Sequence, residues 1–268
     1  MGKRRTGSVA FALLALACVT GACSTASPES NTPSTASSSS GTSSPSRAWS
    51  IVALGDSVPR GTNCHCTSYP PISAEGLTAS TGQTVKATND SVAGATTSSV
   101  LQQLKFDSPV ISHTRAADVL EIEIGANDAA YSKSCGTTVD CYAPGIATVE
   151  KNLAAIVTDA RDITSGHKAL VVLLDYWSVW LGGKYATANG EAYVDAAATV
   201  TDELSSVIKS TAARSGSANV DLRAAFKGPD YAYDESHYLS SDGDHPNAAG
   251  HQMIAEATEA VIQDTLHI

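Results

Sequence analysis

The stretch Ile51-Val52-Ala53-Leu54-Gly55-Asp56-Ser57 is an apolar run that ends in a glycine, an acid and a hydroxyl. A short apolar run closed by a turn residue predicts a buried parallel strand. In open α/β sheets, reacting groups lie at the carboxyl ends of strands, which makes Ser57 a candidate functional residue. An alternative stays open at this point, because Asp56 and Ser57 could simply cap a following helix.

Strand-like and helix-like segments alternate through the rest of the chain. After the strand at Ile51, the expected strands are 84–89, 119–124, 169–174 and 218–222, and the expected helices are 71–80, 96–104, 144–162, 192–214 and 247–265. This alternation predicts a parallel sheet covered by helices on both faces, which is an α/β/α sandwich of three layers. Glu121 and Glu123 interrupt the third strand. In a central strand such acids need partners, or they mark a more exposed position.

The length and composition fit one folded domain. The chain has 268 residues, of which 43% are hydrophobic, so it can bury one large core or two small ones. We assign the folded domain to 48–268 and expect it to be a monomer. The formal net charge is -10, and a surface of this sign argues against a nucleic-acid partner.

The amino-terminal segment has the pattern of an export signal. Basic residues at 3–5 precede an apolar run over 9–19, which is too short to span a bilayer as a permanent helix. We therefore assign 1–22 to a signal peptide. Thr20-Gly21-Ala22-Cys23 resembles a bacterial lipobox, in which the cysteine is lipidated. The Ser/Thr/Pro-rich segment 23–47 predicts a flexible linker. We expect an exported protein, either lipid-anchored at Cys23 on the outer face of the membrane or secreted.

Four cysteines remain within the domain: Cys64, Cys66, Cys135 and Cys141. An even number in an exported domain predicts disulfides. A bridge within Cys64-His65-Cys66 would be strained, which favours two cross-links between the loop after Ser57 and the loop after Asp128. A local pair between Cys135 and Cys141 remains an alternative. Because no second Cys/His pair stands at zinc-ligand spacing, no metal is expected.

Several residue types needed for nucleophilic catalysis fall at one edge of the predicted sheet. A serine hydroxyl becomes a nucleophile when an imidazole takes its proton, and a carboxylate must orient that imidazole. Asp242 and His245, three residues apart, supply both groups beside Ser57. A developing oxyanion also needs donors fixed in advance. The backbone N–H groups of Ser57 and Gly94, with the side-chain amide of Asn127, can supply them.

These motifs resemble those of the SGNH, or GDSL-type, hydrolases, including secreted actinobacterial esterases and lipases. The matching segments are Gly55-Asp56-Ser57, Gly94, Gly125-Ala126-Asn127-Asp128 and Asp242-Gly243-Asp244-His245-Pro246, in the family's order. The resemblance implies a flavodoxin-like fold around a five-stranded parallel sheet. It implies Ser57 as nucleophile, His245 as general base and Asp242 as the orienting acid. Ser57, Gly94 and Asn127 would form the oxyanion hole, with no cofactor.

Other residues offer competing assignments. Asp234 and His237 form a second Asp-X-X-His, and Asp244 is an alternative to Asp242 as the acid. Asp56 and Asp128 are interpreted as loop-bracing acids, because turn carboxylates commonly bind nearby backbone amides. The remaining histidines are expected to be surface or capping residues: His65, His113, His167, His251 and His267.

Two tryptophans follow the fourth predicted strand. Trp177 and Trp180 could line an acyl or sugar pocket, or could pack beneath the adjoining loops. The function expected from the whole pattern is an exported serine esterase or lipase-like hydrolase that works through an acyl-enzyme. The same residues would serve an enzyme that removes O-acetyl groups from polysaccharide. A third hypothesis is a carbohydrate-binding module that has lost catalysis. The expected partners are small ester, lipid or acetylated glycan substrates, with membrane contact only through an N-terminal anchor.

Overall fold

The computed structural model describes residues 47–268. The predicted signal peptide, Cys23 and all of the predicted linker except Arg47 lie outside the described residues.

Five parallel strands form the central sheet. They are β1 (Trp49–Gly55), β2 (Val85–Asn89), β3 (Val119–Glu123), β4 (Leu170–Leu174) and β5 (Ala218–Val220), in the order β2-β1-β3-β4-β5. Strand β1 pairs with β2 on one side and with β3 on the other, so that Ile51 lies opposite Ala87 and Val119. The predicted five-stranded parallel sheet is confirmed.

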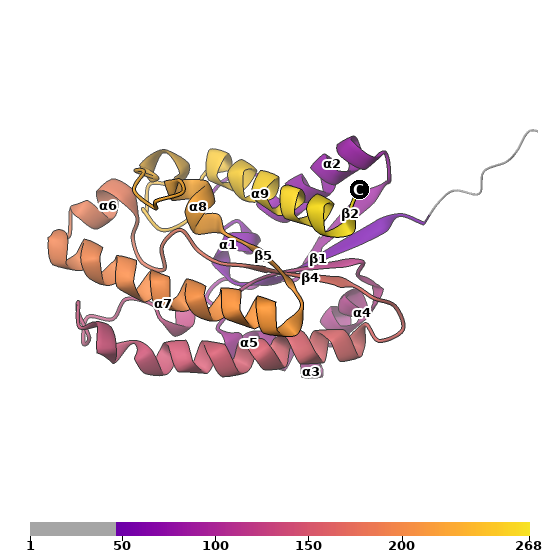
Figure 1. The fold of residues 1–268 in the computed structure, drawn as a ribbon, viewed down its shortest axis with the longest axis horizontal. Helices are drawn as coiled ribbons and strands as arrows, with labels where there is room; N and C mark the ends of the chain where they lie inside the picture. Colours follow the sequence, from indigo (N-terminus) through magenta and orange to yellow (C-terminus); the bar gives the residue numbers. More distant parts are fainter. Residues whose placement is uncertain (1–46) are drawn as a thin grey trace, which may run out of the picture. The chain divides into compact units, whose positions relative to one another are not determined.

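Helices cover both faces of this sheet (Figure 1). One layer contains α2 (Tyr69–Thr81), α8 (Leu222–Lys227) and α9 (Ala248–Leu266). The other contains α3 (Thr97–Phe106), α5 (Ala143–Ile163) and α7 (Glu191–Ser215). The three-layer α/β/α architecture is therefore confirmed.

Shorter helices that were not predicted complete the fold: α1 (Ser57–Arg60), α4 (Ser108–Ala116) and α6 (Gly183–Thr187). Single 3-10 turns occur at Ala126–Asp128, Val139–Cys141 and Ser236–Tyr238. In α4, Asp107 caps the first turn and only Val110 and Thr114 are buried. Two buried positions produce too weak a periodicity to be recognised from the sequence.

Apolar side chains of the sheet form the core. Ile51, Val52 and Leu54 of β1 are completely buried, as expected for a strand between two others. Helix α5 buries one stripe against the sheet, and the expected face is the one observed: Ile146, Val149, Leu153, Ile156 and Val157. Its first turn carries Pro144, where the missing N–H is not needed.

The two acids of β3 are buried. Neither Glu121 nor Glu123 exposes any surface, which excludes the more exposed position considered above. The hydroxyl of Ser73 on α2 faces Glu121 and that of Tyr69 faces Glu123, but neither reaches ordinary hydrogen-bond geometry. Burial raises the pKa of both carboxyls well above the usual range, and the nearby Glu259 and Asp56 raise them further. The uncharged forms are therefore favoured in the core.

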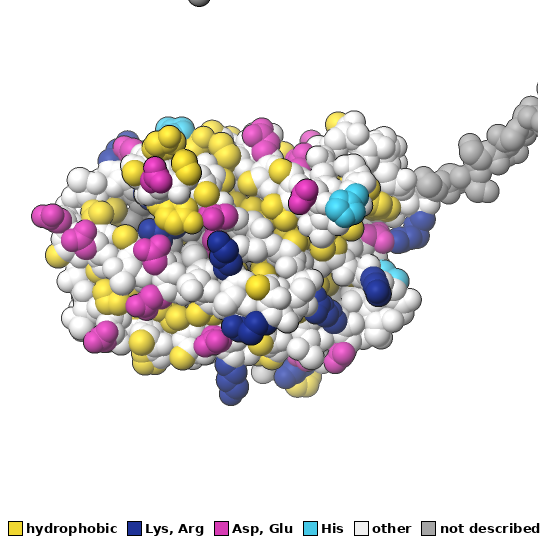
Figure 2. Space-filling view, in the orientation of Figure 1, with side chains coloured by type: hydrophobic (Ala, Val, Ile, Leu, Met, Phe, Trp, Pro, Cys, Tyr) yellow, Lys and Arg dark blue, Asp and Glu magenta, His cyan; other side chains and the backbone are white. Residues whose placement is uncertain are grey.

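Charged side chains are dispersed over the surface. On the face shown in Figure 2, Lys and Arg lie singly among Asp and Glu rather than gathering in one patch. Within residues 47–268, none of the helices combines the length and apolar character required to cross a membrane.

The raised pKa of Glu121 predicts a pH-dependent stability. The folded protein holds this proton more tightly than the unfolded chain, whose ordinary value is 4.5. The resulting stability is present below that value and is lost as pH rises through the folded pKa. Wild type should therefore lose stability between about pH 5 and about pH 9, while Glu121→Gln should not. We expect the free energy of unfolding of the variant, minus that of wild type, to rise by about 1–3 kcal/mol over this range, measured by urea unfolding.

Glu75→Gln on the exposed side of α2 is the matched control, since its carboxyl is already solvated. A difference between Glu121→Gln and wild type that is the same at both pH values would contradict the prediction.

Candidate active site

Ser57 begins helix α1 at the carboxyl end of β1. Its neighbour Asp56 is the N-cap of that helix, and the Asp56 carboxylate accepts the Val58 backbone N–H at 3.1 Å. Gly55 is required before it, because a Cβ there would collide with the carbonyl oxygen of Glu123 on β3. The chain therefore turns sharply where the strand ends, and both interpretations of the Asp-Ser pair hold: Asp56 caps a helix and Ser57 lies at the sheet edge.

A tyrosine from the neighbouring loop holds Asp56. The hydroxyl of Tyr176, just after β4, donates to Asp56 Oδ2 at 2.7 Å. Burial raises the pKa of Asp56 to about 6, although the hydrogen bonds from Tyr176 and Val58 oppose this shift. Asp56 thus braces the loop that carries Ser57.

Asp242 and His245 meet within one tight turn. His245 Nδ1 lies 2.7 Å from Asp242 Oδ2. The turn closes because the Ser240 N–H donates to the His245 carbonyl at 2.8 Å. Gly243 adopts a φ of 76° between the two residues, and a Cβ there would also collide with Tyr185. Only glycine fits this position without strain.

Four donors converge on the Asp242 carboxylate. Oδ1 accepts the backbone N–H groups of Asp244 and His245, both at 3.1 Å, while Oδ2 accepts Asn63 Nδ2 at 2.6 Å and the imidazole. Burial alone would raise the pKa of Asp242, but these hydrogen bonds, led by Asn63, lower it to about 2. An ionised Asp242 requires a proton on His245 Nδ1, which leaves Nε2 as the proton acceptor.

Ser57 and His245 line the same small cavity, which has a volume of about 60 Å³. Asn127, Trp177, Val179 and Asp244 also line it. The described residues show no direct hydrogen bond between Ser57 and His245. Contacts of this kind often tighten only when substrate binds.

Gly94 and Asn127 lie on adjoining loops. Asn127 donates one amide hydrogen to the Ala95 carbonyl at 2.9 Å, which ties it to the segment that follows β2. Gly94 has a φ of 77°. Neither its N–H nor that of Ser57 donates to another group in the described part of the chain. Asp128 braces the Asn127 loop, because it accepts the backbone N–H and the hydroxyl of Thr97 at 2.9 and 2.7 Å.

The two tryptophans have different surroundings. Trp177 lines the cavity and stacks on Phe226 with ring centroids 4.3 Å apart. Trp180 is absent from the cavity wall, and its indole N–H donates to the Ala129 carbonyl at 2.9 Å. Trp180 therefore packs beneath the loops. Trp177 also packs in the interior, against Phe226, but in addition it faces the cavity.

The alternative Asp234–His237 pair, and Asp244 as an alternative partner of His245, have less favourable geometry for an acid–histidine hydrogen bond. Asp234 accepts the backbone N–H of Ser236 at 2.8 Å, and no hydrogen bond joins it to His237 in the described residues. Asp244 Oδ2 lies 3.9 Å from His245 Nδ1, compared with 2.7 Å for Asp242. The turn thus favours Asp242 as the partner of His245.

The disulfides differ from the favoured prediction. Cys64 pairs with Cys66 and Cys135 pairs with Cys141, at Cα separations of 5.1 and 5.7 Å. The predicted cross-links between the two loops are therefore wrong, while the local alternative for Cys135 and Cys141 is the one observed. Residues His65 and Asn63 have positive φ values, which let the chain curl so that Cys64 and Cys66 meet.

The remaining histidines were expected at the surface or in caps, and His251 is not. It is completely buried on α9, and burial lowers its pKa to about 4. One of its ring nitrogens and the sulfurs of Cys64 and Cys66 lie within 4.8 Å of one another. This set has the chemistry of a metal site, but a disulfide removes the thiolates that would be its main ligands.

Sequence reasoning missed Asn63 and Tyr176, which hold Asp242 and Asp56. Both contacts join segments that are far apart in the chain, 179 residues in one case and 120 in the other. Neither residue belongs to a motif with a fixed offset from its partner. The only signal was position, because Asn63 follows the serine motif and Tyr176 follows β4.

Comparison with known proteins agrees with this architecture. Residues 53–253 match the sequence model of the GDSL-like lipase/acylhydrolase family. A lipase from a goat rumen metagenome has a similar fold, with a TM-score of 0.62, 22% identity and coverage of 80% of this chain and 97% of that one. Phospholipase A1 from Streptomyces albidoflavus has a TM-score of 0.59 and 23% identity, and the match covers 80% of this chain and 100% of that one.

An acetyl-xylooligosaccharide esterase from Geobacillus, in a mutant form, gives a TM-score of 0.57 and 20% identity, and the match covers 80% of this chain and 94% of that one. No curated protein matches the chain. Fold and family together define an ester-hydrolysing enzyme. The chain belongs to the GDSL-like lipase/acylhydrolase family.

Removal of the Tyr176 hydroxyl should destabilise the protein more at high pH than at low pH. The folded pKa of Asp56, about 6, exceeds its ordinary value of 3.8, so its contribution to stability is lost as pH rises through about 6. Tyr176→Phe removes a donor that favours the ionised form. We expect the variant to lose about 1–3 kcal/mol near pH 8 and less near pH 5, by urea unfolding.

Tyr233→Phe, at an exposed tyrosine, is the matched control. In an Asp56→Asn background, Tyr176→Phe should cost the same stability near pH 5 and near pH 8. A cost that still depends on pH in that background would refute the role given to Asp56.

Proposed function

We propose that the protein hydrolyses carboxylic esters through an acyl-enzyme on Ser57, with His245 as general base and Asp242 as its orienting acid. The observation that carries this proposal is the hydrogen bond of 2.7 Å between His245 Nδ1 and Asp242 Oδ2, at the cavity that Ser57 also lines. Membership of an ester-hydrolysing family supports the same reaction.

In the first half of the reaction, Ser57 Oγ attacks the ester carbonyl carbon while His245 Nε2 accepts the hydroxyl proton. The low pKa of Asp242 keeps its carboxylate ionised, so it can stabilise the imidazolium that forms. Collapse of the tetrahedral intermediate breaks the bond to the alcohol oxygen. His245 returns the proton to that oxygen, and the acyl group stays on Ser57.

The oxyanion of the intermediate would be held by three donors. They are the N–H groups of Ser57 and Gly94 and the second amide hydrogen of Asn127. The Asn127 bond to the Ala95 carbonyl supports this role, because it fixes the amide before substrate arrives. In the second half of the reaction, water attacks the acyl carbon while His245 Nε2 takes its proton. The bond from the acyl carbon to Ser57 Oγ then breaks, His245 returns the proton to Ser57 Oγ, and the carboxylic acid leaves.

The dimensions of the cavity favour short acyl groups. A volume of about 60 Å³, walled by Trp177 and Val179, suits an acetyl group better than a long chain. This observation supports the second candidate function, removal of O-acetyl groups from a polysaccharide. The acetyl-xylooligosaccharide esterase among the similar structures is compatible with it.

Replacement of the nucleophile tests the reaction. We expect Ser57→Ala to lose at least about a thousandfold in kcat/KM on p-nitrophenyl esters, because the acyl-enzyme has no oxygen on which to form. The panel runs from acetate to palmitate and includes acetylated xylan, with activity highest on the shortest esters. A fluorophosphonate probe should label wild type and not the variant.

Asp242→Asn and Asp244→Asn form a matched pair of controls. The first should lower kcat far more than the second, because only Asp242 lies within hydrogen-bond distance of His245. Full activity of Ser57→Ala would end the triad proposal. Wild type that neither cleaves an ester nor labels would favour the binding-module hypothesis.

Export and anchoring form a separate proposal, based on the basic and apolar pattern of the first residues and on Cys23. The mass of the mature amino terminus in a bacterial host tests it. We expect a diacylated Cys23 if the chain is anchored, while a cleaved and unmodified terminus would indicate secretion. An uncleaved Met1 would contradict both.

A further inference from the structure

The loop after α1 reaches back to the turn that carries Asp242 and His245. Thr62 donates its N–H to the Ser57 carbonyl at 3.0 Å, so the chain reverses directly behind the nucleophile. Asn63 follows, and its side chain spans to Asp242 Oδ2 at 2.6 Å. Six residues after the serine, the chain is thus tied to the acid of the proposed triad.

Asn63 binds the same oxygen as the imidazole. Asp242 Oδ2 accepts both Asn63 Nδ2 and His245 Nδ1, at 2.6 and 2.7 Å. A carboxylate can rotate about its Cβ–Cγ bond, and a second donor in a fixed direction restricts this rotation. The Asn63 amide therefore determines where Oδ2 points, and with it where the ring of His245 points.

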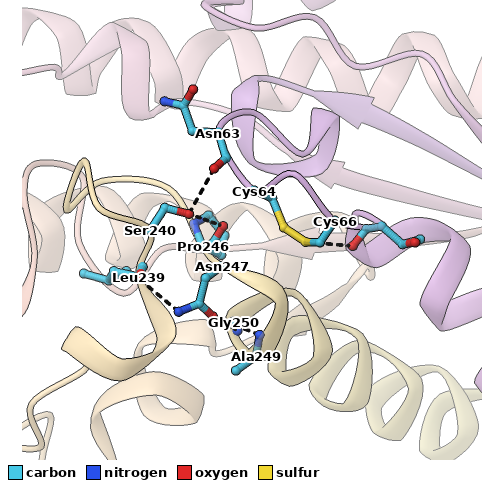
Figure 3. The surroundings of a disulfide bond; sticks show 10 residues. Asn63, Cys64, Cys66, Leu239, Ser240, Pro246, Asn247, Ala249 and Gly250 are labelled. Carbon is cyan, nitrogen blue, oxygen red and sulfur yellow. Dashed lines mark hydrogen bonds between the residues drawn. A yellow bond between two sulfur atoms is a disulfide. The ribbon is translucent and has the colours of Figure 1, made fainter.

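A second contact secures the backbone of Asn63. The Ser240 hydroxyl donates to the Asn63 carbonyl at 3.3 Å, as Figure 3 shows. The same hydroxyl lies 3.1 Å from the Pro246 carbonyl, so its single O–H is shared between the loop after α1 and the turn. Side chain and backbone of Asn63 thus hold the turn at two points.

The Cys64–Cys66 disulfide, which immediately follows, constrains the loop in this shape. Asn63 and His65 have φ values of 59° and 53°, in the left-handed region that few residues favour. The disulfide joins the residues on either side of His65 and lies beside the first turn of α9 (Figure 3). A covalent link of this kind limits the conformations in which Asn63 would release Asp242.

We propose that Asn63 is a positioning residue, held by the Cys64–Cys66 disulfide, that orients the Asp242 carboxylate for His245. The proposal rests on the function proposed above and deepens it. The hydrogen bonds led by Asn63 also lower the pKa of Asp242, which keeps the acid ionised through the cycle. Asn63 does not line the cavity, so its effect should fall on kcat rather than on KM.

Asn63→Gly is the most informative substitution. Glycine accepts the φ of 59° without strain, so the variant removes the amide and leaves the backbone free to keep its shape. We expect kcat on p-nitrophenyl acetate to fall about tenfold, with KM and Tm nearly unchanged, as for loss of a hydrogen bond to a charged group. Asn63→Asp keeps size and backbone preference but replaces the donor with a carboxylate, and should lose at least as much.

His65→Gly is the matched control. It places the same residue at a similar φ in the same loop, and its side chain is exposed. It should keep the wild-type kcat. Equal losses in Asn63→Gly and His65→Gly would show that loop flexibility, not the amide, matters, and would overturn the proposal.

A double-mutant cycle separates positioning from general structural damage. In an Asp242→Asn background, Asn63→Gly should have little further effect on the rate of fluorophosphonate labelling, because the two residues act as one unit. Additive losses would contradict the proposal.

The disulfide is tested in the same way. Replacing Cys64 and Cys66 together by serine should lower kcat severalfold in wild type and little in the Asn63→Gly background. The control replaces Cys135 and Cys141 and should leave kcat unchanged. If Ser57→Ala is inactive while Asn63→Gly retains full kcat, the proposed function stands and this inference fails; if Ser57→Ala is fully active, the proposed function itself fails.

Discussion

The backbone pairing of β1 with strands on both sides is the constraint on which the site depends. Parallel strands run in one direction, so their carboxyl ends meet at a single edge, and β1 ends there in Gly55, Asp56 and Ser57. A Cβ at Gly55 would collide with β3, so strand and turn fit together only with glycine. The loop with Asn127 leaves the neighbouring strand at the same edge, and the fold therefore assembles the cavity from segments far apart in sequence.

The sheet and the long helices could be predicted because their signals are local. The apolar run at Ile51 and the stripe on α5 report burial directly, and the bounds agree within about two residues. Family motifs likewise indicated Ser57, Asn127 and the Asp242–His245 pair. The contacts of Asn63, Tyr176 and the buried His251 could not be predicted, because each depends on a partner more than a hundred residues away or on packing between layers. The favoured disulfide prediction was wrong for a related reason. Positive φ values at Asn63 and His65 permit the pairing of Cys64 with Cys66, which their spacing in the sequence argued against.

Several buried acids lie near one another at the edge of the sheet where Ser57 stands. Asp56, Glu123 and Asp175 lie near the carboxyl ends of three neighbouring strands, and burial raises the pKa of each, in Asp175 to about 7. Asp175 accepts the Leu222 N–H at 2.6 Å and so anchors α8, as Asp56 anchors α1. Asp242 differs from these acids, because its side chain is partly exposed and four donors lower its pKa to about 2. The balance between burial and hydrogen-bond donors therefore sets the pKa of each carboxyl here.

Backbone pairing of Leu239 with Pro246 and the hydrogen bond from the Ser240 N–H to the His245 carbonyl close the turn from Leu239 to Pro246. Gly243 supplies the left-handed backbone conformation that the turn needs. Asp242 and His245, the proposed acid and base, are consequently held in a fixed arrangement relative to each other. What can still change is the position of this turn relative to Ser57, the proposed nucleophile. In the proposed mechanism, the rate then depends on how this turn lies against the loop that carries Asn63. Substitutions outside the cavity that shift the turn would change the rate without altering any reacting atom.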